Sequence, residues 1–162
     1  MNKNLLLSIC AGAVALTSAA LFASGWRINV SPSLPGWIYK TVPIERARPG
    51  DYVSFCRPVL IGNIPRGMCP DGTMPLLKRV IAASGQDVRF GRKMIEVGER
   101  QVFRAIPFDR DSRGTLLPRP PLDDWVRLAP GEVVVWADHN SSVDSRYFGV
   151  IGGVGGVGGL QR

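Results

Sequence analysis

The chain has 162 residues, enough for one compact domain with a small inserted sub-domain and too few for several large domains. Its hydrophobic content of 45%, with 19 glycines and 13 prolines, excludes a disordered chain and favours a mainly β fold over a helical bundle. The net charge of +7 is carried by scattered basic residues, which argues against a nucleic-acid-binding protein and favours proximity to an anionic membrane surface.

The first predicted element is a helix long enough to cross a membrane. Leu5 to Ala23 is an unbroken run of nineteen uncharged residues, which as a helix would extend about 28 Å, close to the hydrocarbon thickness. Lys3 precedes the run, so the rest of the chain is expected on the far side of the membrane. A signal peptide cleaved near residues 18–20 is the alternative. We favour a retained anchor within residues 1–26, because the run exceeds the usual core of a signal peptide.

The stretch at 29–39 predicts a stiff turn. Pro32 and Pro35 fix their own φ and push the residues before them toward extended geometry, while Gly36 permits a sharp exit. Ser33 lies between the prolines, where its hydroxyl could be held in one attack geometry if a base lies nearby. The competing interpretation is that this serine only shapes a turn.

A strand is predicted at 52–56, followed by a loop at 57–75 that is rich in proline and glycine. Cys56 ends the strand and Cys69 lies in the loop. In an oxidising compartment the two could form a disulfide that closes a loop of about a dozen residues. Two unpaired, partly buried thiols are the alternative, since the sequence does not give their separation.

Residues 76–82 predict a buried strand that carries one lysine. In strand alternation Leu76, Lys78 and Val80 share one face, so the lysine has apolar neighbours. Only four of the 20 basic residues are lysines, so a lysine here indicates a role that arginine cannot fill. A desolvated lysine can lose its proton and act as a base. The alternative is a lysine that reaches solvent from a half-exposed strand.

Residues 91–127 are expected to form an inserted β sub-domain with little chemistry, whose charges form a solvated face. A strong apolar strand at 133–136 then leads to a polar cluster at 138–149. The cluster includes Asp144 and Arg146, which on their own could be a structural ion pair in a loop.

Three stretches together resemble the bacterial type I signal peptidases, and most of all the TraF-type peptidases of conjugative transfer systems. They are Ser-Pro-Ser-Leu-Pro at 31–35, Leu-Lys-Arg-Val-Ile-Ala-Ala-Ser-Gly at 77–85 and Asp-Ser-Arg-Tyr-Phe-Gly at 144–149. Their order after a membrane segment agrees with the family, and the resemblance covers most of the chain outside 91–127. General signal peptidases have methionine where this chain has Leu34, which favours the conjugative branch.

The resemblance implies a signal-peptidase-like β-fold and a serine/lysine dyad. Ser33 would attack the scissile carbonyl, and a neutral Lys78 would take its proton and return it to the leaving amine. Ser31 matches the position whose hydroxyl joins the Ser33 backbone N–H in stabilising the oxyanion. The catalytic core is expected at 27–90 and 128–151, with a flexible glycine-rich tail at 152–162.

Three further residues match positions that support the site in the family. Ser142 matches the residue that orients the lysine amine by a hydrogen bond, and Asp144 and Arg146 match a charged pair. The chain departs from the usual Pro-x-Gly-x-Tyr pattern, because glycine follows the proline directly and Trp37 stands where the glycine is usual.

For the conjugative branch, the resemblance implies a membrane-inserted pro-pilin or similar exported precursor as substrate, processed during plasmid transfer beside the mating-pair apparatus. Water could resolve the acyl-enzyme, or the pilin's own N-terminal amine could do so and give a cyclic product. The protein is expected in the inner membrane with its catalytic domain in the periplasm, or soluble there if the N-terminal segment is cleaved. No nucleic-acid partner is expected.

Two other functions stay open. The chain could be a non-catalytic, membrane-anchored β-module of a conjugation or secretion apparatus, in which Ser33 merely shapes a turn. It could also be a hydrolase that pairs His139 with Cys56 or a serine, although no surrounding motif supports this. Because His139 is the single histidine, a multi-histidine metal site is excluded, and we expect neither a metal ion nor a cofactor.

Overall fold

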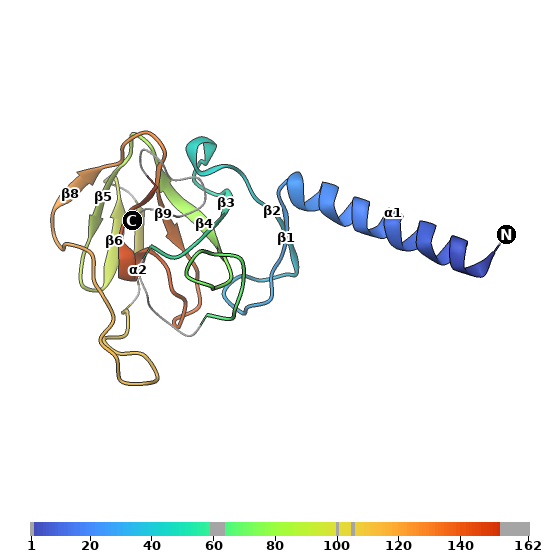
Figure 1. The fold of residues 1–162 in the computed structure, drawn as a ribbon. Coiled ribbons are helices and arrows are strands. Elements are labelled where there is room, and N and C mark those ends of the chain that lie inside the picture. Colours follow the sequence, from blue (N-terminus) through green and yellow to red (C-terminus); the bar gives the residue numbers. More distant parts are fainter. Residues whose placement is uncertain (1, 59–63, 100, 105, 153–162) are drawn as a thin grey trace.

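One long helix stands outside a β-rich body (Figure 1). Helix α1 (Lys3–Ala23) is capped by the side chain of Asn2, which accepts a hydrogen bond from the Asn4 backbone N–H. None of its residues is buried, and its length and mean hydropathy of 2.2 are sufficient to cross a membrane. The helix is therefore consistent with a membrane anchor or a signal sequence. This computed structural model describes residues 2–58, 64–99, 101–104 and 106–152.

The described residues confirm the predicted mainly β fold. Their strands are, in chain order, β1 (Trp26–Ile28), β2 (Ile38–Lys40), β3 (Tyr52–Phe55), β4 (Leu76–Ala83), β5 (Asp87–Phe90), β6 (Met94–Val97), β7 (Gln101–Arg104), β8 (Trp125–Arg127), β9 (Glu132–Trp136) and β10 (Ile151–Gly152). A short 3-10 helix η1 (Ile44–Arg46) precedes β3, and a four-residue helix α2 (Ser145–Phe148) follows β9.

The first large sheet has the strand order β10-β9-β4-β3, with antiparallel pairing throughout. The register between β4 and β9 shifts between Val80 and Ala82. At this irregularity the alternation of faces is interrupted, so two consecutive residues face the same apolar cluster, and Ala83 faces the first cluster again. Val80 packs with Val53 and Phe55 in one apolar cluster, whereas Ile81 and Ala82 pack in the other.

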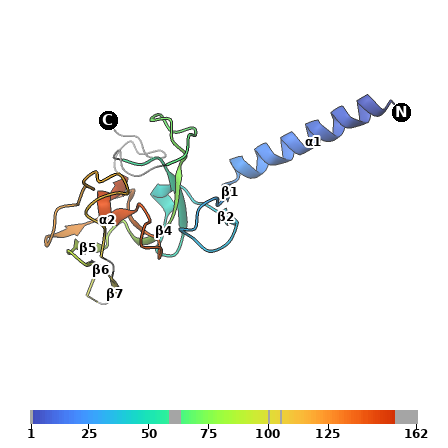
Figure 2. The ribbon, with the colours of Figure 1, turned by 90° about the horizontal axis from the view of Figure 1, so that it is seen from below.

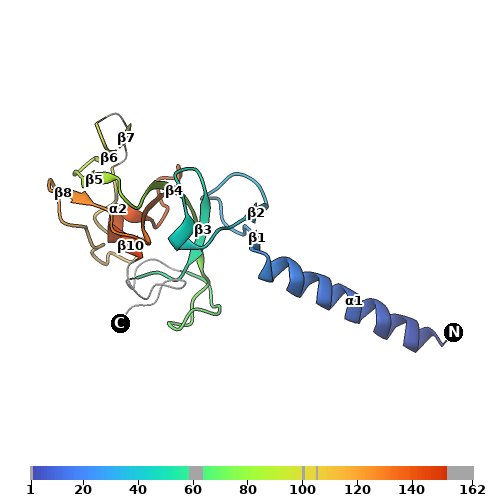
Figure 3. The same ribbon diagram turned by 90° about the horizontal axis from the view of Figure 1, so that it is seen from above.

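The second large sheet has the order β7-β6-β5-β8 and lies at the end of the body remote from α1, as the views in Figure 2 and Figure 3 also show. Its first strand is β5, so in the structure this sheet begins at Asp87, whereas the sequence placed the start of the sub-domain at residue 91. The chain turns between β4 and β5 at Gly85, whose φ of +82° favours glycine.

Strands β1 and β2 form a separate two-stranded sheet between α1 and the first large sheet. The sequence indicated only a turn here. Tyr39 of β2 packs on Tyr52 of β3 with ring centroids 4.6 Å apart, and the Val42 N–H donates to the Tyr52 carbonyl at 3.0 Å. These contacts attach the small sheet to the edge of the first large sheet.

A disulfide bond joins Cys56 to Cys69 across the loop that follows β3. Arg57 also crosses this loop, because its Nε donates to Asp71 at 2.6 Å. Because of the disulfide, Cys56 is not a free thiol. Most of the predicted glycine-rich tail, residues 153–162, lies outside the described residues.

Candidate active site

The loop between β1 and β2 carries Ser33 and is closed at its base by a hydrogen bond from the Asn29 N–H to the Trp37 carbonyl, at 2.8 Å. Leu34 is buried, whereas Ser31 is exposed and Ser33 is partly buried. A hairpin thus presents the predicted nucleophile, with one apolar side chain anchoring the loop.

Asn29 is the internal brace of this loop. Its side chain is buried, and its Nδ2 donates to the carbonyls of Leu34 at 2.8 Å and Gly36 at 3.1 Å. Its Oδ1 accepts from the backbone N–H of Ser31 at 3.1 Å and from the Ser31 hydroxyl at 3.2 Å. One amide therefore ties both sides of the loop around Ser33.

The hydroxyls of Ser31 and Ser33 are hydrogen-bonded to each other. Because the single Ser31 proton goes to Asn29 Oδ1, the Ser33 hydroxyl must donate to Ser31 Oγ. The hydrogen bonds are thus all donated in one direction, from Ser33 to Ser31 and from Ser31 to Asn29. This chain fixes the resting orientation of the predicted nucleophile.

Lys78 lies in β4 with only 3% of its surface exposed. It pairs across the sheet with Val53, which is fully buried, and its strand neighbour Val80 belongs to the same apolar cluster as Val53. Burial lowers the pKa of Lys78 from 10.5 to about 8, Asp144 opposes this shift and Arg146 adds to it. Lys78 is thus an easily deprotonated amine in an apolar strand.

Asp144 and Arg146 form a buried ion pair behind this amine. Arg146 Nε and Nη2 each donate to the Asp144 carboxylate at 2.7 Å, and both side chains are almost completely buried. The carboxylate also accepts from the backbone N–H groups of Ala137 and Arg146, both at 3.1 Å, and caps α2. Its four hydrogen bonds compensate for its burial.

The same guanidinium holds the loop that leads to Ser142. Arg146 Nη2 donates to the carbonyls of Ala137 at 3.2 Å, His139 at 3.0 Å and Ser142 at 3.3 Å. Ser142 Oγ is buried and has no hydrogen-bond partner among the described residues. The predicted bond from Ser142 to Lys78 is therefore not formed in the structure, although the serine is held in a fixed loop.

The structure assembles the predicted residues in two groups. Ser31 and Ser33 lie in the hairpin loop, and Lys78 of β4 interacts electrostatically with Asp144 and Arg146 at the start of α2. The hairpin packs on β3, the strand that pairs with Lys78, so neighbouring elements carry the two groups. The Ser33 hydroxyl bonds Ser31 and not Lys78 in this state.

His139 is exposed, and its Nδ1 interacts with the Ser141 hydroxyl at 2.8 Å. The carboxylate of Asp138 instead accepts from Trp136 Nε1 at 3.0 Å. Since Cys56 is bonded to Cys69, the Cys56/His139 hydrolase hypothesis is wrong. Among the described residues, no group of three or more His, Cys, Asp or Glu side chains could hold a metal ion.

Asn29 is the residue that the sequence analysis missed. The available signal was its place two residues before Ser31, because an asparagine side chain commonly bonds backbone two residues further along the chain. Its second pair of bonds, to the carbonyls after Ser33, depends on how the hairpin closes and could not be predicted.

Comparisons with known proteins identify the family of the chain. The family described as signal peptidase, peptidase S26, matches residues 2–159. A probable conjugal transfer protein TraF from Sinorhizobium fredii (strain NBRC 101917 / NGR234) is 35% identical, with 93% of this chain and 84% of the relative covered. A plasmid transfer protein TraF from Escherichia coli is 34% identical, with 88% and 85% covered. No solved structure matches the chain significantly.

Proposed function

Because the chain belongs to the signal peptidase family, peptidase S26, we propose that it is a membrane-anchored serine endopeptidase with Ser33 as nucleophile and Lys78 as general base. The observation that carries this proposal is the buried amine of Lys78, with its pKa of about 8. At that pKa roughly one amine in ten is neutral at pH 7, which an arginine cannot provide. The family match confirms the resemblance found in the sequence.

In the proposed reaction the Ser33 hydroxyl turns from Ser31 toward Lys78, gives its proton to Nζ and attacks the scissile carbonyl. The Ser31 hydroxyl, which donates to Asn29 at rest, turns to the oxyanion and donates beside the Ser33 backbone N–H. The protonated Lys78 returns the proton to the leaving amine. Ser142, with its buried hydroxyl, is the residue proposed to orient the amine during this cycle.

The Asp144–Arg146 pair is proposed to support the base without disabling it. Alone, the carboxylate would hold Lys78 protonated, since a nearby negative charge raises the pKa of an amine. Arg146 lowers the pKa of Lys78 and so opposes the effect of Asp144. Burial is the largest influence on this pKa. The pair also fixes the loop that carries Ser142.

The proposed substrate is a pro-pilin or similar exported precursor, because the relatives are named as conjugal or plasmid transfer proteins. It would bind as an added strand near Ser33 on the periplasmic side, with α1 in the inner membrane and the mating-pair apparatus nearby. Water or the pilin's own N-terminal amine would resolve the acyl-enzyme. Residues 27–90 and 128–151 would supply the catalytic core, and 91–127 the inserted sub-domain.

One observation favours a second candidate function, a non-catalytic β-module of the conjugation apparatus. The Ser33 hydroxyl bonds Ser31, as it would if it only shaped the loop. The Lys78→Arg substitution, considered in the Discussion, separates the two functions.

Co-expression with candidate pro-pilins tests the proposed peptidase. Wild type should release a shortened product, and Ser33→Ala and Lys78→Ala should leave the precursor intact, because the nucleophile or base is lost. The product mass is measured, since hydrolysis adds one water relative to cyclisation. His139→Ala is the control and should process normally. Processing by Ser33→Ala, or its loss in His139→Ala, would contradict the proposal.

Asn29→Ala should slow cleavage by up to about 100-fold, because the loop would no longer hold Ser33 in one geometry. The effect should fall on kcat rather than KM, which steady-state cleavage of a precursor peptide measures. Asn140→Ala, at an exposed position, is the matched control and should be neutral. Unchanged kcat in Asn29→Ala would show that the brace has no role in positioning Ser33.

A further inference from the structure

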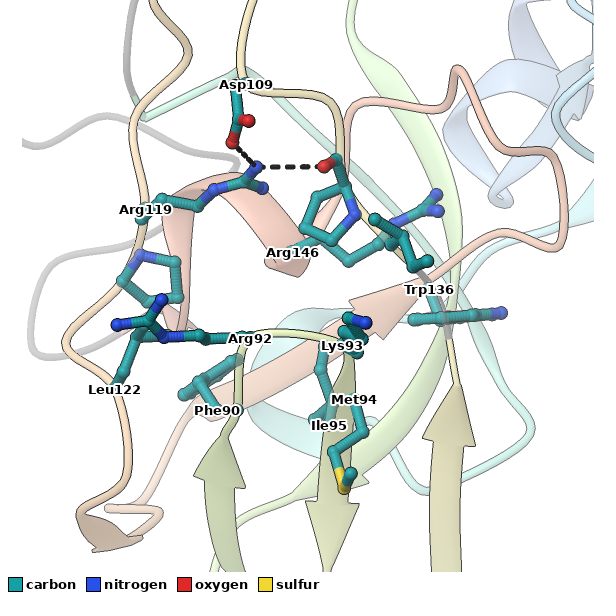
Figure 4. Close-up of a pocket in the computed structure, with 14 residues that line it drawn as sticks. Phe90, Arg92, Lys93, Met94, Ile95, Asp109, Arg119, Leu122, Trp136 and Arg146 are labelled. Atoms are coloured by element: carbon teal, nitrogen blue, oxygen red, sulfur yellow. Dashed lines mark hydrogen bonds and ion pairs between the residues drawn. The ribbon is translucent and has the colours of Figure 1, made fainter.

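A pocket of about 260 Å³ lies in the part of the protein that contains the second large sheet. Its walls come from the turn between β5 and β6, from the segment at 106–122, and from Trp136 and Arg146 (Figure 4). The volume is just below the range of about 300 to 1,000 Å³ typical of sites for drug-sized ligands, so a smaller group fits it. No residue of the Ser33 loop lines it.

One edge of the pocket holds a buried donor that is not satisfied. Arg119 Nη2 donates at 2.9 Å to each of three oxygens, the carbonyls of Pro107 and Phe108 and the carboxylate of Asp109. Arg119 Nη1 is buried and has no hydrogen-bond partner among the described residues. A guanidinium fixed in this way is prepared to donate to an anion, and a buried donor without a partner is unfavourable.

Two further basic side chains of the lining add positive charge. Arg92 and Lys93 are exposed on the turn between β5 and β6, and neither forms an ion pair with another described residue. The two other arginines of the pocket are already paired, Arg119 with Asp109 and Arg146 with Asp144. The unbalanced charge of the pocket therefore comes from Arg92 and Lys93, which favours an anionic ligand.

The rest of the lining is apolar and includes Phe90, Ile95, Leu122 and Trp136. The indole of Trp136 is also covered by Arg146, whose Cζ lies 4.7 Å from the ring centroid. A ligand that fills this pocket needs an apolar group directly beside its negative charge. A C-terminal apolar residue has both groups on one Cα, whereas an aspartate or glutamate side chain has no apolar group beside its carboxylate.

We propose that this pocket binds the C-terminal carboxylate and last apolar side chain of a protein partner. Arg119 and Lys93 would receive the carboxylate, with Arg119 Nη1 reaching it after a shift of its side chain, and Phe90, Leu122 and Trp136 would receive the apolar side chain. The pocket belongs to the end of the body remote from α1, so a protein tail reaches it more readily than a lipid headgroup (Figure 1). This site goes beyond the proposed peptidase and does not depend on it.

Calorimetric titration of the full chain in detergent micelles tests this site. The probes are N-acetyl-Ala-Ala-Ala-Leu with a free carboxylate and the same peptide as its C-terminal amide. The free acid should bind at least about ten-fold more tightly, because only it can satisfy the charged donors. Its affinity should also fall as salt is added.

Variants assign the binding to this pocket. Lys93→Glu should weaken binding of the free acid by at least about ten-fold, while Lys40→Glu, a charge reversal on exposed β2, should change it by less than about two-fold. Arg119→Gln should act like Lys93→Glu, and the latter keeps the test valid if Arg119→Gln misfolds.

Four results would overturn the proposal. They are equal affinity for acid and amide, no detectable binding of either, no effect of Lys93→Glu, and equal losses in Lys93→Glu and Lys40→Glu. Displacement of the free acid by short-chain phosphatidylglycerol at lower concentration than by the peptide itself would assign the pocket to lipid and would also overturn it.

Discussion

Lys78→Met is expected to remove most peptidase activity and to stabilise the folded protein. The fall in the pKa of Lys78 from 10.5 to about 8 corresponds to roughly 3 kcal/mol of unfavourable free energy for burying the charged amine. Methionine is similarly long and uncharged, so the free energy of unfolding at pH 7 should rise by roughly 2 to 3 kcal/mol. Loss of the general base should lower kcat by about 100- to 10,000-fold.

The stability difference should depend on pH in one direction. The folded-state pKa lies below the unfolded value, so between pH 8 and 10.5 the unfolded chain binds more protons, and wild type gains stability as the pH rises. Denaturant unfolding in micelles should therefore show the advantage of Lys78→Met below pH 8, shrinking toward pH 10.5. Lys40→Met, at an exposed position, should show no such difference. A destabilised Lys78→Met protein would contradict a desolvated amine.

Lys78→Arg separates a base from a structural cation. Arginine keeps the charge but does not lose its proton, so a peptidase should lose activity and a β-module should retain its role. For wild type, kcat/KM should rise with pH through about 8, because the amine must be neutral to accept the Ser33 proton. Normal processing by Lys78→Arg would leave the non-catalytic module as the better account.

Asp144→Ala is expected to lower the free energy of unfolding by about 3 to 5 kcal/mol. The substitution would leave the guanidinium of Arg146, which is 4% exposed, without its counter-charge inside the protein. It would also remove the cap of α2 and the acceptor of the Ala137 N–H. Denaturant unfolding in micelles measures the change.

An exposed ion pair supplies the matched control. Asp87 and Arg127 pair at 3.1 Å with side chains 49% and 69% exposed, so Asp87→Ala should cost less than about 1 kcal/mol. The double variant Asp144→Ala/Arg146→Met should be less destabilised than the sum of its single variants, because no uncompensated charge remains. Equal costs for Asp144→Ala and Asp87→Ala would show that burial adds nothing to the Asp144–Arg146 pair.

The strands with the plainest patterns were the ones that the sequence predicted. The apolar runs at 76–82 and 133–136 form β4 and β9, and the alternation around Lys78 predicted correctly that its face would be apolar. The run from Leu5 forms α1 for the same reason, since its composition leaves no polar face.

Other features depend on contacts that the local pattern does not contain. Strands β1 and β2 have three residues each and are stabilised by pairing with each other. Helix α2 lies in a polar stretch. It begins there because the Asp144 side chain caps it and also binds Arg146. The hydrogen bond that Ser33 donates to Ser31 likewise depends on Asn29, whose Oδ1 accepts the hydrogen bond from the Ser31 hydroxyl.

Strand β4 connects the remote sheet to the amine of Lys78. Three residues beyond Lys78, Ile81 lies on the opposite face of the strand and shares an apolar cluster with Val88 and Ile95 of β5 and β6. Loosening that distant sheet would release the far end of the strand, let water reach Nζ and return its basicity toward that of an ordinary lysine. The packing of the second large sheet would thus help to set the proton affinity of Lys78 through β4.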